Sequence, residues 1–168
     1  MSQLVALSLS IGVLGGIATY IFLAWMPHYL IWAAFIAWAC YFGTGGNTEA
    51  LKKTITCNIF GAICAWVAAL LIVSAGGGAG LNAIIVGATV LVLCLGAHVS
   101  ALSSIPASVY GYAAVFAFLL GNPSANLTKD NLMSASPANA LIAVAASMVI
   151  GAIFGLLSGK LAGALGKS

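Results

Sequence analysis

The segment TITCNIFGAICAWVAALLIV, residues 54–73, decides the fold class, because it runs for 20 residues without a charged side chain. The hydrocarbon core of a lipid bilayer takes about 20 residues of α-helix per crossing, so this segment predicts a membrane-spanning helix. Small residues recur in it at every fourth position, which predicts a helix face that a neighbouring backbone approaches closely. These residues are Cys57, Gly61, Ala65 and Ala69.

Further apolar segments flank this one on both sides, and together they predict six transmembrane helices. Their approximate ranges are 4–25, 27–42, 81–97, 104–120 and 136–165. Proline is common in the first turn of a helix, so we expect Pro27 and Pro106 at helix starts, and Pro137 in a first turn capped by Ser136. The predicted fold class is all-α: a polytopic membrane protein with a single transmembrane domain over residues 1–168.

The composition supports the same class, because 63% of the 168 residues are hydrophobic and 4% are charged. Soluble domains carry about 25% charged residues. The outer surface of this chain is therefore expected to face the lipid bilayer. Six crossings with short loops use the whole length, so we expect no ATPase, receptor or nucleic-acid-binding domain. The five lysines are scattered and form no patch for nucleic acid.

The distribution of the lysines predicts the orientation in the membrane. With the N-terminus inside, Lys52 and Lys53 lie in an inner loop, and Lys160 and Lys167 lie near an inner C-terminus. Lys129 then lies outside. Lysine is enriched in cytoplasmic loops, so this pattern predicts that both termini are cytoplasmic.

The chain also repeats itself at two places. GNTEALKK after the second segment resembles GNPSANLTK after the fifth, and IFGAICAWV from Ile59 resembles VIGAIFGLL from Val149. The first match aligns Gly46, Asn47 and Ala50 with Gly121, Asn122 and Ala125. Three helices per half would invert the second half, so the pattern predicts two inverted repeats, residues 1–78 and 79–168, as in transporters and channels. Chance similarity between Gly/Ala-rich helices is the alternative.

Small residues also recur at every fourth position in the last segment. They are Ser147, Gly151, Gly155, Gly159 and Gly163. Because residues four apart share one face of a helix, this stripe predicts close packing against another helix of the same chain. A subunit interface or a narrow pore wall is the alternative.

Polar residues near the ends of the predicted helices form a candidate solute pathway, because polar groups within a bilayer commonly mark such pathways. The candidates are Thr44, Asn47, Glu49, His98 and Asn122. Residues 45–49 and 121–124 would lie at corresponding mouths, where helix N-termini and loop amides contact a solute. A structural role is the alternative, since Glu49 suits the first turn of a helix and His98 suits capping at the membrane edge.

The sequence contains no recognisable catalytic or metal-binding set. Paired carboxylates, a Ser/His/Asp set, HExxH and a Cys/His cluster are all missing. We therefore expect no catalytic residue, no metal, no cofactor and no enzymatic activity. No acidic residue falls in the middle of a segment, which favours a passive pathway. Asn58 and Asn82, which lie within segments, are expected to hydrogen-bond neighbouring helices.

Two stretches resemble a known family. LIWAAFIAWACYFGTGGNTEALKK, residues 30–53, and SIPASVYGYAAVFAF, residues 104–118, are similar to the YcdZ-like family of small bacterial inner-membrane proteins, whose function is unknown. This resemblance covers nearly the whole chain and implies a bacterial inner-membrane location. Trp32-Ala33, residues 43–48 and the segment around Gly61 also show a more distant likeness to the fusaric-acid-resistance and aromatic-acid exporter superfamily. The Gln-Pro pair that those exporters carry before the turn is missing here.

These observations lead to two hypotheses for the function. The first is a small-solute channel or transporter of the bacterial inner membrane, built from inverted halves and assembled as a homo-oligomer. The repeat and the matched polar turns favour it. The second is a non-transporting assembly or accessory subunit, which the small-residue stripe of the last segment favours.

Overall fold

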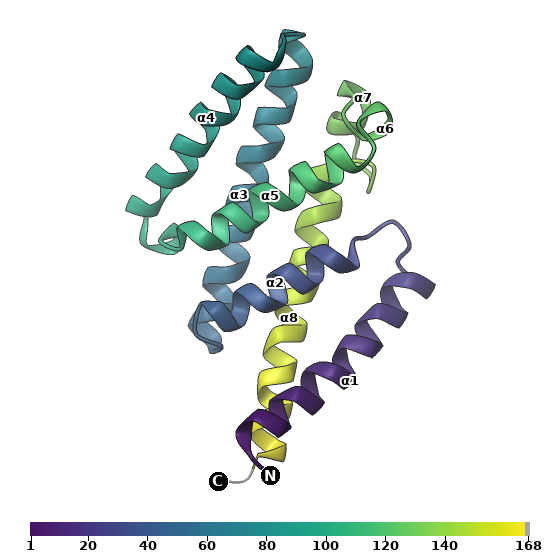
Figure 1. Cartoon of the computed structure of the whole chain (residues 1–168), viewed down its shortest axis with the longest axis vertical. Coiled ribbons are helices and arrows are strands. Elements are labelled where there is room, and N and C mark those ends of the chain that lie inside the picture. The colour runs from purple at the N-terminus through teal and green to yellow at the C-terminus, as the bar shows by residue number, and fades with distance from the viewer. Residues whose placement is uncertain (167–168) are drawn as a thin grey trace.

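Helices α3 (Thr48–Ala75) and α8 (Ala140–Leu165) contact each other at the centre of the bundle in the computed structural model of the chain (Figure 1). The structure describes residues 1–166. Helix α1 (Gln3–Ala24) packs mainly on α8, and α4 (Ala79–Leu95) packs mainly on α3. Each central helix is therefore covered by one long outer helix.

Two shorter helices cross the central pair. Helix α2 (Ile31–Gly43) packs mainly on α8, and α5 (Ile105–Gly121) packs mainly on α3. Short elements complete the described chain: the 3-10 helices Gly96–His98 (η1) and Ser100–Leu102 (η2), then α6 (Pro123–Asn126) and α7 (Lys129–Met133). Every regular element within residues 1–166 is helical, which confirms the all-α prediction.

Helix length separates the six predicted segments into two groups. Four segments of the described chain are long and apolar enough to cross a membrane: α1, α3, α8 and the stretch Ala79–His98, which joins α4 to η1. Helices α2 and α5 are apolar but have 13 and 17 residues. At about 1.5 Å per residue they are about 20 and 26 Å long, against a hydrocarbon core of about 30 Å. These lengths and compositions agree with a membrane protein.

The start of α2 differs from the prediction. Pro27 does not open this helix, because the chain first turns at Tyr29, whose backbone N–H donates to the Met26 carbonyl at 2.9 Å. The helix begins at Ile31, after Leu30 donates its N–H to Ser147 Oγ on α8 at 2.9 Å. A contact with a distant helix therefore sets this boundary. The prediction for Pro106 is confirmed, since it lies in the first turn of α5.

The two central helices also begin elsewhere than predicted. Helix α3 starts at Thr48, six residues before the apolar segment, because Asn47 accepts the Ala50 N–H at 2.8 Å and caps it. Helix α8 starts at Ala140, not at Ser136-Pro137. Its cap is Asn139, whose Oδ1 accepts the Leu141 N–H at 3.0 Å. Hydrogen bonds at the helix ends, rather than the edges of the apolar segments, decide both starts.

Replacing Asn139 with alanine is expected to lower the free energy of unfolding by about 1–3 kcal/mol. The buried Asn139 side chain also donates through Nδ2 to the carbonyl oxygens of Leu132 and Ser134, at 2.9 and 3.0 Å. Its loss removes the partner of the Ser134 carbonyl and the cap of α8, whereas the Leu132 carbonyl still accepts from Trp66 Nε1 at 2.8 Å. Unfolding of the purified protein in detergent would measure the effect. Asn122→Ala, at an exposed position, is the control, and an equal loss there would contradict the prediction.

Glycines allow the closest helix crossings in the bundle. A Cβ atom on Gly61 of α3 would overlap the Ser108 carbonyl of α5, and one on Gly111 of α5 would overlap the Asn58 carbonyl of α3. A Cβ atom on Gly151 of α8 would likewise overlap the Ala34 carbonyl of α2. The short helices α2 and α5 therefore lie in direct backbone contact with α8 and α3.

Candidate functional site: a cavity between the two short helices

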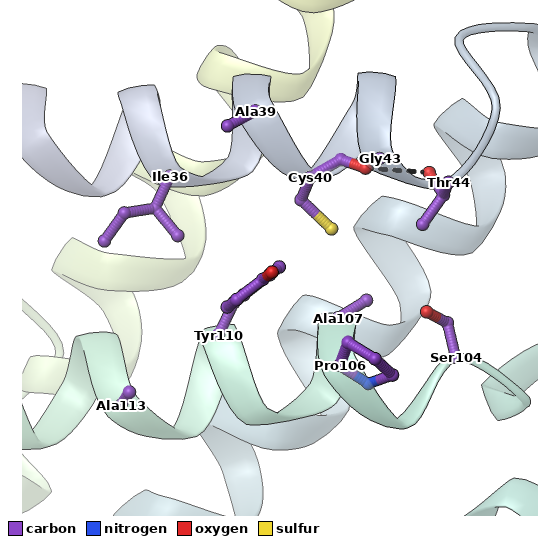
Figure 2. A pocket seen from close by; sticks show the side chains of 10 residues that line it. All are labelled: Ile36, Ala39, Cys40, Gly43, Thr44, Ser104, Pro106, Ala107, Tyr110 and Ala113. Atoms are coloured by element: carbon purple, nitrogen blue, oxygen red, sulfur yellow. Dashed lines mark hydrogen bonds between the residues drawn. The ribbon is translucent and has the colours of Figure 1, made fainter.

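A cavity of about 490 Å³ lies between α2 and the first half of α5 (Figure 2). Thr44 and Ser104 line one end of it, where α2 ends and α5 is about to begin. Ile36 and Ala113 line the other end, and Tyr110 lies between. The cavity thus has a polar end and mostly apolar walls. This combination is typical of binding sites for small molecules.

Cys40 and Tyr110 face each other across the cavity. The Cys40 sulfur points from α2 into the space between the helices, and the Tyr110 side chain extends toward it from α5 (Figure 2). Cys40 is buried, whereas Tyr110 is exposed on the outer side. Cys40 also belongs to a small buried cluster with Cys57 of α3 and Ala107 of α5.

The polar end of the cavity is held by the tight turn between α2 and α3. Gly45 and Gly46 adopt φ angles of 122° and 64°, which side-chain-bearing residues rarely adopt, so the chain reverses within a few residues. Thr44 Oγ1 donates to the Cys40 carbonyl at 2.9 Å and lies 3.0 Å from Thr54 Oγ1 on α3. The Tyr41 hydroxyl donates to the Gly46 carbonyl at 2.7 Å. These bonds fix the end of α2 against the start of α3.

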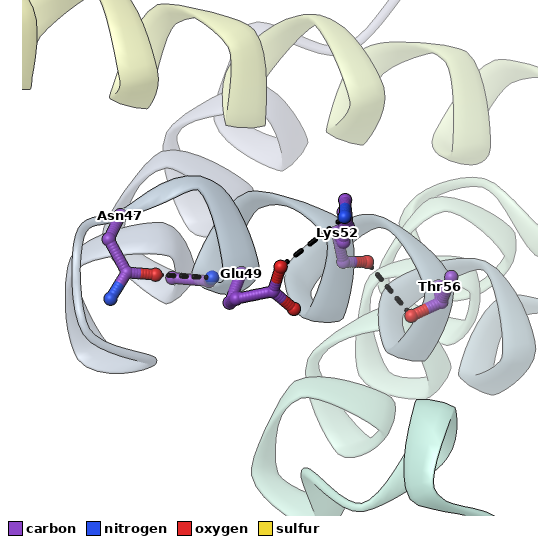
Figure 3. Close-up of polar contacts among 5 residues, drawn as sticks. Asn47, Glu49, Lys52 and Thr56 are labelled. Atoms are coloured by element: carbon purple, nitrogen blue, oxygen red, sulfur yellow. Dashed lines mark hydrogen bonds and ion pairs between the residues drawn. The ribbon is translucent and has the colours of Figure 1, made fainter.

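Of the predicted pathway residues, Thr44 lines this cavity, and two others lie at the start of α3. Asn47 caps the helix, as described above. Glu49 is exposed in the first turn and pairs with Lys52 at 3.3 Å (Figure 3). Thr56, one turn further along, donates from Oγ1 to the Lys52 carbonyl at 2.9 Å. The contacts of Asn47 and Glu49 are those of a helix start.

His98 and Asn122 lie apart from this group. His98 is exposed in η1, and Asn122 is exposed at the far end of α5, where it accepts a hydrogen bond from Ser124 at 3.0 Å. Figure 1 places the end of α5 on the opposite side of the bundle from the turn between α2 and α3. The five predicted residues therefore do not converge on one site.

The small-residue stripe of α8 follows α2 for part of its length. Ser147, Gly151 and Gly155 are buried, and Gly155 faces the ring of Tyr41. Gly159 lies at the edge of the contact, because a Cβ atom added to it would lie 3.5 Å from the Tyr41 hydroxyl oxygen. Gly163 has nothing within 4 Å of that position. The contact with α2 thus fades toward the end of α8.

Two polar residues within apolar helices do not behave as predicted. Among residues 1–166, no hydrogen-bond partner is found for either side-chain atom of Asn58 or for the Oδ1 atom of Asn82. The prediction that Asn58 hydrogen-bonds a neighbouring helix is therefore wrong. Ser108 Oγ, on α5, is also buried without a partner in this part of the chain. The sequence marks Asn58 as a polar residue in an apolar segment, but nothing in it distinguishes Ser108 from other helix serines.

Comparison with known proteins gives a family match. A family model described as "Protein of unknown function (DUF1097)" matches residues 8–163. No curated protein and no solved structure matches the chain.

Proposed function

This chain belongs to the DUF1097 family of proteins of unknown function, and we propose that it is a small-solute channel or transporter of the bacterial inner membrane. The observation that carries the proposal is the cavity between α2 and α5. Short hydrophobic segments in corresponding positions of two transporter halves commonly mark the binding site. Helices α2 and α5 are the two short apolar helices of the described chain, and the cavity lies between them.

Six membrane crossings form part of this proposal. The apolar helices run alternately in opposite directions in Figure 1, with α2 and α5 included. Non-helical backbone at membrane depth is tolerated where protein covers it or where it lines a cavity. The turn before α2 meets this condition through the bond from Leu30 to Ser147, and Ser104 before α5 lines the cavity.

An inverted repeat is the second part of the proposal. A constant offset of 90 residues relates α3 to α8: it pairs Cys57 with Ser147 and Gly61 with Gly151, and the two helices end at Ala75 and Leu165. The pairs also make equivalent contacts. Cys57 Sγ donates to the carbonyl of Ala101, in the segment before α5. Ser147 Oγ accepts the backbone N–H of Leu30, in the segment before α2.

Helices α2 and α5 follow the same scheme at an offset of 74 residues. Their first residues, Ile31 and Ile105, correspond to each other. Ala34 and Ser108 also correspond, and their carbonyl groups lie against the equivalent glycines Gly151 of α8 and Gly61 of α3. Two corresponding pairs line the cavity: Ile36 with Tyr110, and Ala39 with Ala113. The cavity therefore lies between two equivalent helices, where a transporter with inverted halves carries its solute.

The lysine distribution supports a cytoplasmic location for the polar end of the cavity. Lys52 and Lys53 lie at the start of α3 and Lys160 lies near the end of α8, on the side of the bundle where α1 begins and α8 ends (Figure 1). Lys129 lies in α7, at the opposite side. Lys167 is outside the described residues. With lysine-rich ends inside, Thr44 and Ser104 face the cytoplasm.

The walls of the cavity favour a neutral solute with an apolar part. None of its lining residues, which all fall within residues 36–113, carries a charge. A charged solute would lose its hydration there without gaining a partner. The volume of about 490 Å³ suits a small molecule.

Flux through proteoliposomes tests this function. Benzamide, which is neutral and has a polar and an apolar end, is expected to enter faster than into protein-free liposomes. Ala39→Trp should reduce this flux strongly, because Ala39 lines the cavity and an indole there obstructs it. Ala88→Trp, at an exposed position of α4, is the control and should keep the flux. Equal flux with and without protein, for benzamide, glycerol and urea alike, would contradict the proposal.

The alternative is a non-transporting accessory subunit. The surface of α4 favours this role, because the buried residues of this helix are Thr89 and Leu93 and the others remain accessible to a partner protein. Purification in mild detergent separates the two functions. A different protein in stoichiometric amount supports the accessory role, whereas a homo-oligomer that carries the flux supports the transporter.

A further inference from the structure

Asn58 of α3 and Ser108 of α5 are polar groups buried where the two helices touch. Their exposed fractions are 1% and 0%, and the described part of the chain offers no partner to Asn58 Nδ2, Asn58 Oδ1 or Ser108 Oγ. Buried polar side chains in native proteins almost always have hydrogen-bond partners. An amide without any is strongly disfavoured in a bundle that lipid surrounds, because water cannot replace the missing partner there. These three atoms therefore require an explanation.

The fold itself does not require polar residues at this crossing. The equivalent crossing of α8 with α2 has Met148 at the position of Asn58 and Ala34 at the position of Ser108. Met148 and Ala34 are both buried. One half of the molecule therefore builds the same crossing from apolar side chains, so packing alone does not account for the polar pair in the other half.

The polar pair lies directly behind the wall of the cavity. Ala107 lines the cavity and precedes Ser108 on α5. Cys57 precedes Asn58 on α3, and it belongs to the cluster with Cys40 and Ala107 at the cavity wall. A solute that reaches the pair must displace α5 relative to α2 and α3, because the methyl group of Ala107 cannot rotate out of the way.

We propose that Asn58 and Ser108 are the residues that recognise the polar group of the transported solute. The inference rests on the proposed function and specifies its substrate class. A side-chain amide both donates and accepts hydrogen bonds, and so does a serine hydroxyl. The matching solute is neutral and carries an amide, a hydroxyl or a protonated carboxyl group on an apolar body. The solute provides the partners that the three buried atoms lack within residues 1–166.

The test measures solute binding and stability in the same variants. A Gly43→Cys variant provides the reporter, because Gly43 lines the cavity and nothing lies within 4 Å of an added Cβ atom. Alkylation at position 43 by N-ethylmaleimide is followed by mass spectrometry with and without benzamide. In this background, benzamide is expected to slow the alkylation. Adding Asn58→Leu should weaken this protection at least about tenfold, because the variant loses hydrogen bonds to the bound amide.

Stability separates recognition from a structural role. Leucine has the same number and branching of side-chain heavy atoms as asparagine and no polar atom to desolvate, so Asn58→Leu should leave the melting temperature in detergent unchanged or raise it. Ser108→Ala should likewise weaken protection without lowering the melting temperature. Met148→Leu, at the equivalent position of the other half, is the control and should keep the protection.

Each result supports or overturns the inference. Full protection by benzamide in Asn58→Leu and Ser108→Ala overturns it while leaving the transport function intact. Lost protection together with lower melting temperatures in both variants also overturns it, because a structural role then accounts for the loss. If benzamide neither crosses the membrane nor protects the parent protein, the proposed function fails and the inference fails with it.

Discussion

Gly61→Ala and Gly151→Ala are each expected to destabilise the bundle by roughly 3 kcal/mol or more, near the upper end of overpacking effects. A Cβ atom at either position would occupy the space of a carbonyl oxygen, of Ser108 in one case and of Ala34 in the other. Helix backbones are stiff, so the neighbouring helix must move away as a whole. The van der Waals contacts that hold membrane helices together are then lost along the crossing.

Unfolding of the purified variants by increasing denaturant in detergent measures these losses. Gly163→Ala is the matched control, because it belongs to the same stripe of α8 and nothing lies within 4 Å of its added Cβ atom. We expect this control to be as stable as the parent protein. We also expect similar losses for Gly61→Ala and Gly151→Ala, since the proposed repeat makes them equivalent. Stability in both variants equal to that of the control would show that these crossings do not hold the bundle together.

Cysteines introduced at Gly43 and Gly121 are expected to react with a membrane-impermeant maleimide from opposite sides of the membrane. Gly43 ends α2 and Gly121 ends α5. Three crossings, α3, α4 and α5, separate the two positions if all six apolar helices span the membrane. Nothing lies within 4 Å of a Cβ atom at either glycine, so both substitutions fit without disturbing the fold.

Inside-out and right-side-out vesicles distinguish the two reactions. The lysine distribution predicts labelling at position 43 in inside-out vesicles and at position 121 in right-side-out vesicles. Labelling both positions after permeabilisation controls for their reactivity. If only the four long helices crossed, α3 and α4 alone would separate the two positions. Both cysteines would then react from the same side, and the six-crossing arrangement would be wrong.

The approximate positions of the six longer helices of the described chain followed from the sequence, whereas several of their ends and the short helices α6 and α7 did not. Apolar composition identified α3 but excluded its first turn, because Lys52 and Lys53 are not apolar. Residues 48–53, which include these lysines, nevertheless belong to α3, because Asn47 caps the helix before them. Proline was an uncertain guide: Pro106 lies in a first turn, whereas Pro27 lies in a turn before its helix.

The candidate site was only partly predictable. Thr44 was identified because it is polar and follows an apolar segment, and it lines the cavity. Asn47 and Glu49 share these features but serve the start of α3 instead. Tyr110 lies near the start of an apolar segment, where aromatic residues ordinarily anchor at the membrane interface, so the sequence does not mark it as a cavity residue. Its place in the cavity depends on how α2 and α5 cross, which no local pattern encodes.

The sequence by itself determined that the described chain is a bundle of apolar helices suited to lipid, because hydropathy and helix length are properties of each segment alone. It also marked the faces at which helices approach closely, since small residues four apart must share a side. Only the tertiary structure decided which helix meets which face, where the cavity lies, and that Asn58 and Ser108 are buried without hydrogen-bond partners among residues 1–166. Those features depend on residues far apart in the chain, so they exist only once α2, α3, α5 and α8 have packed together.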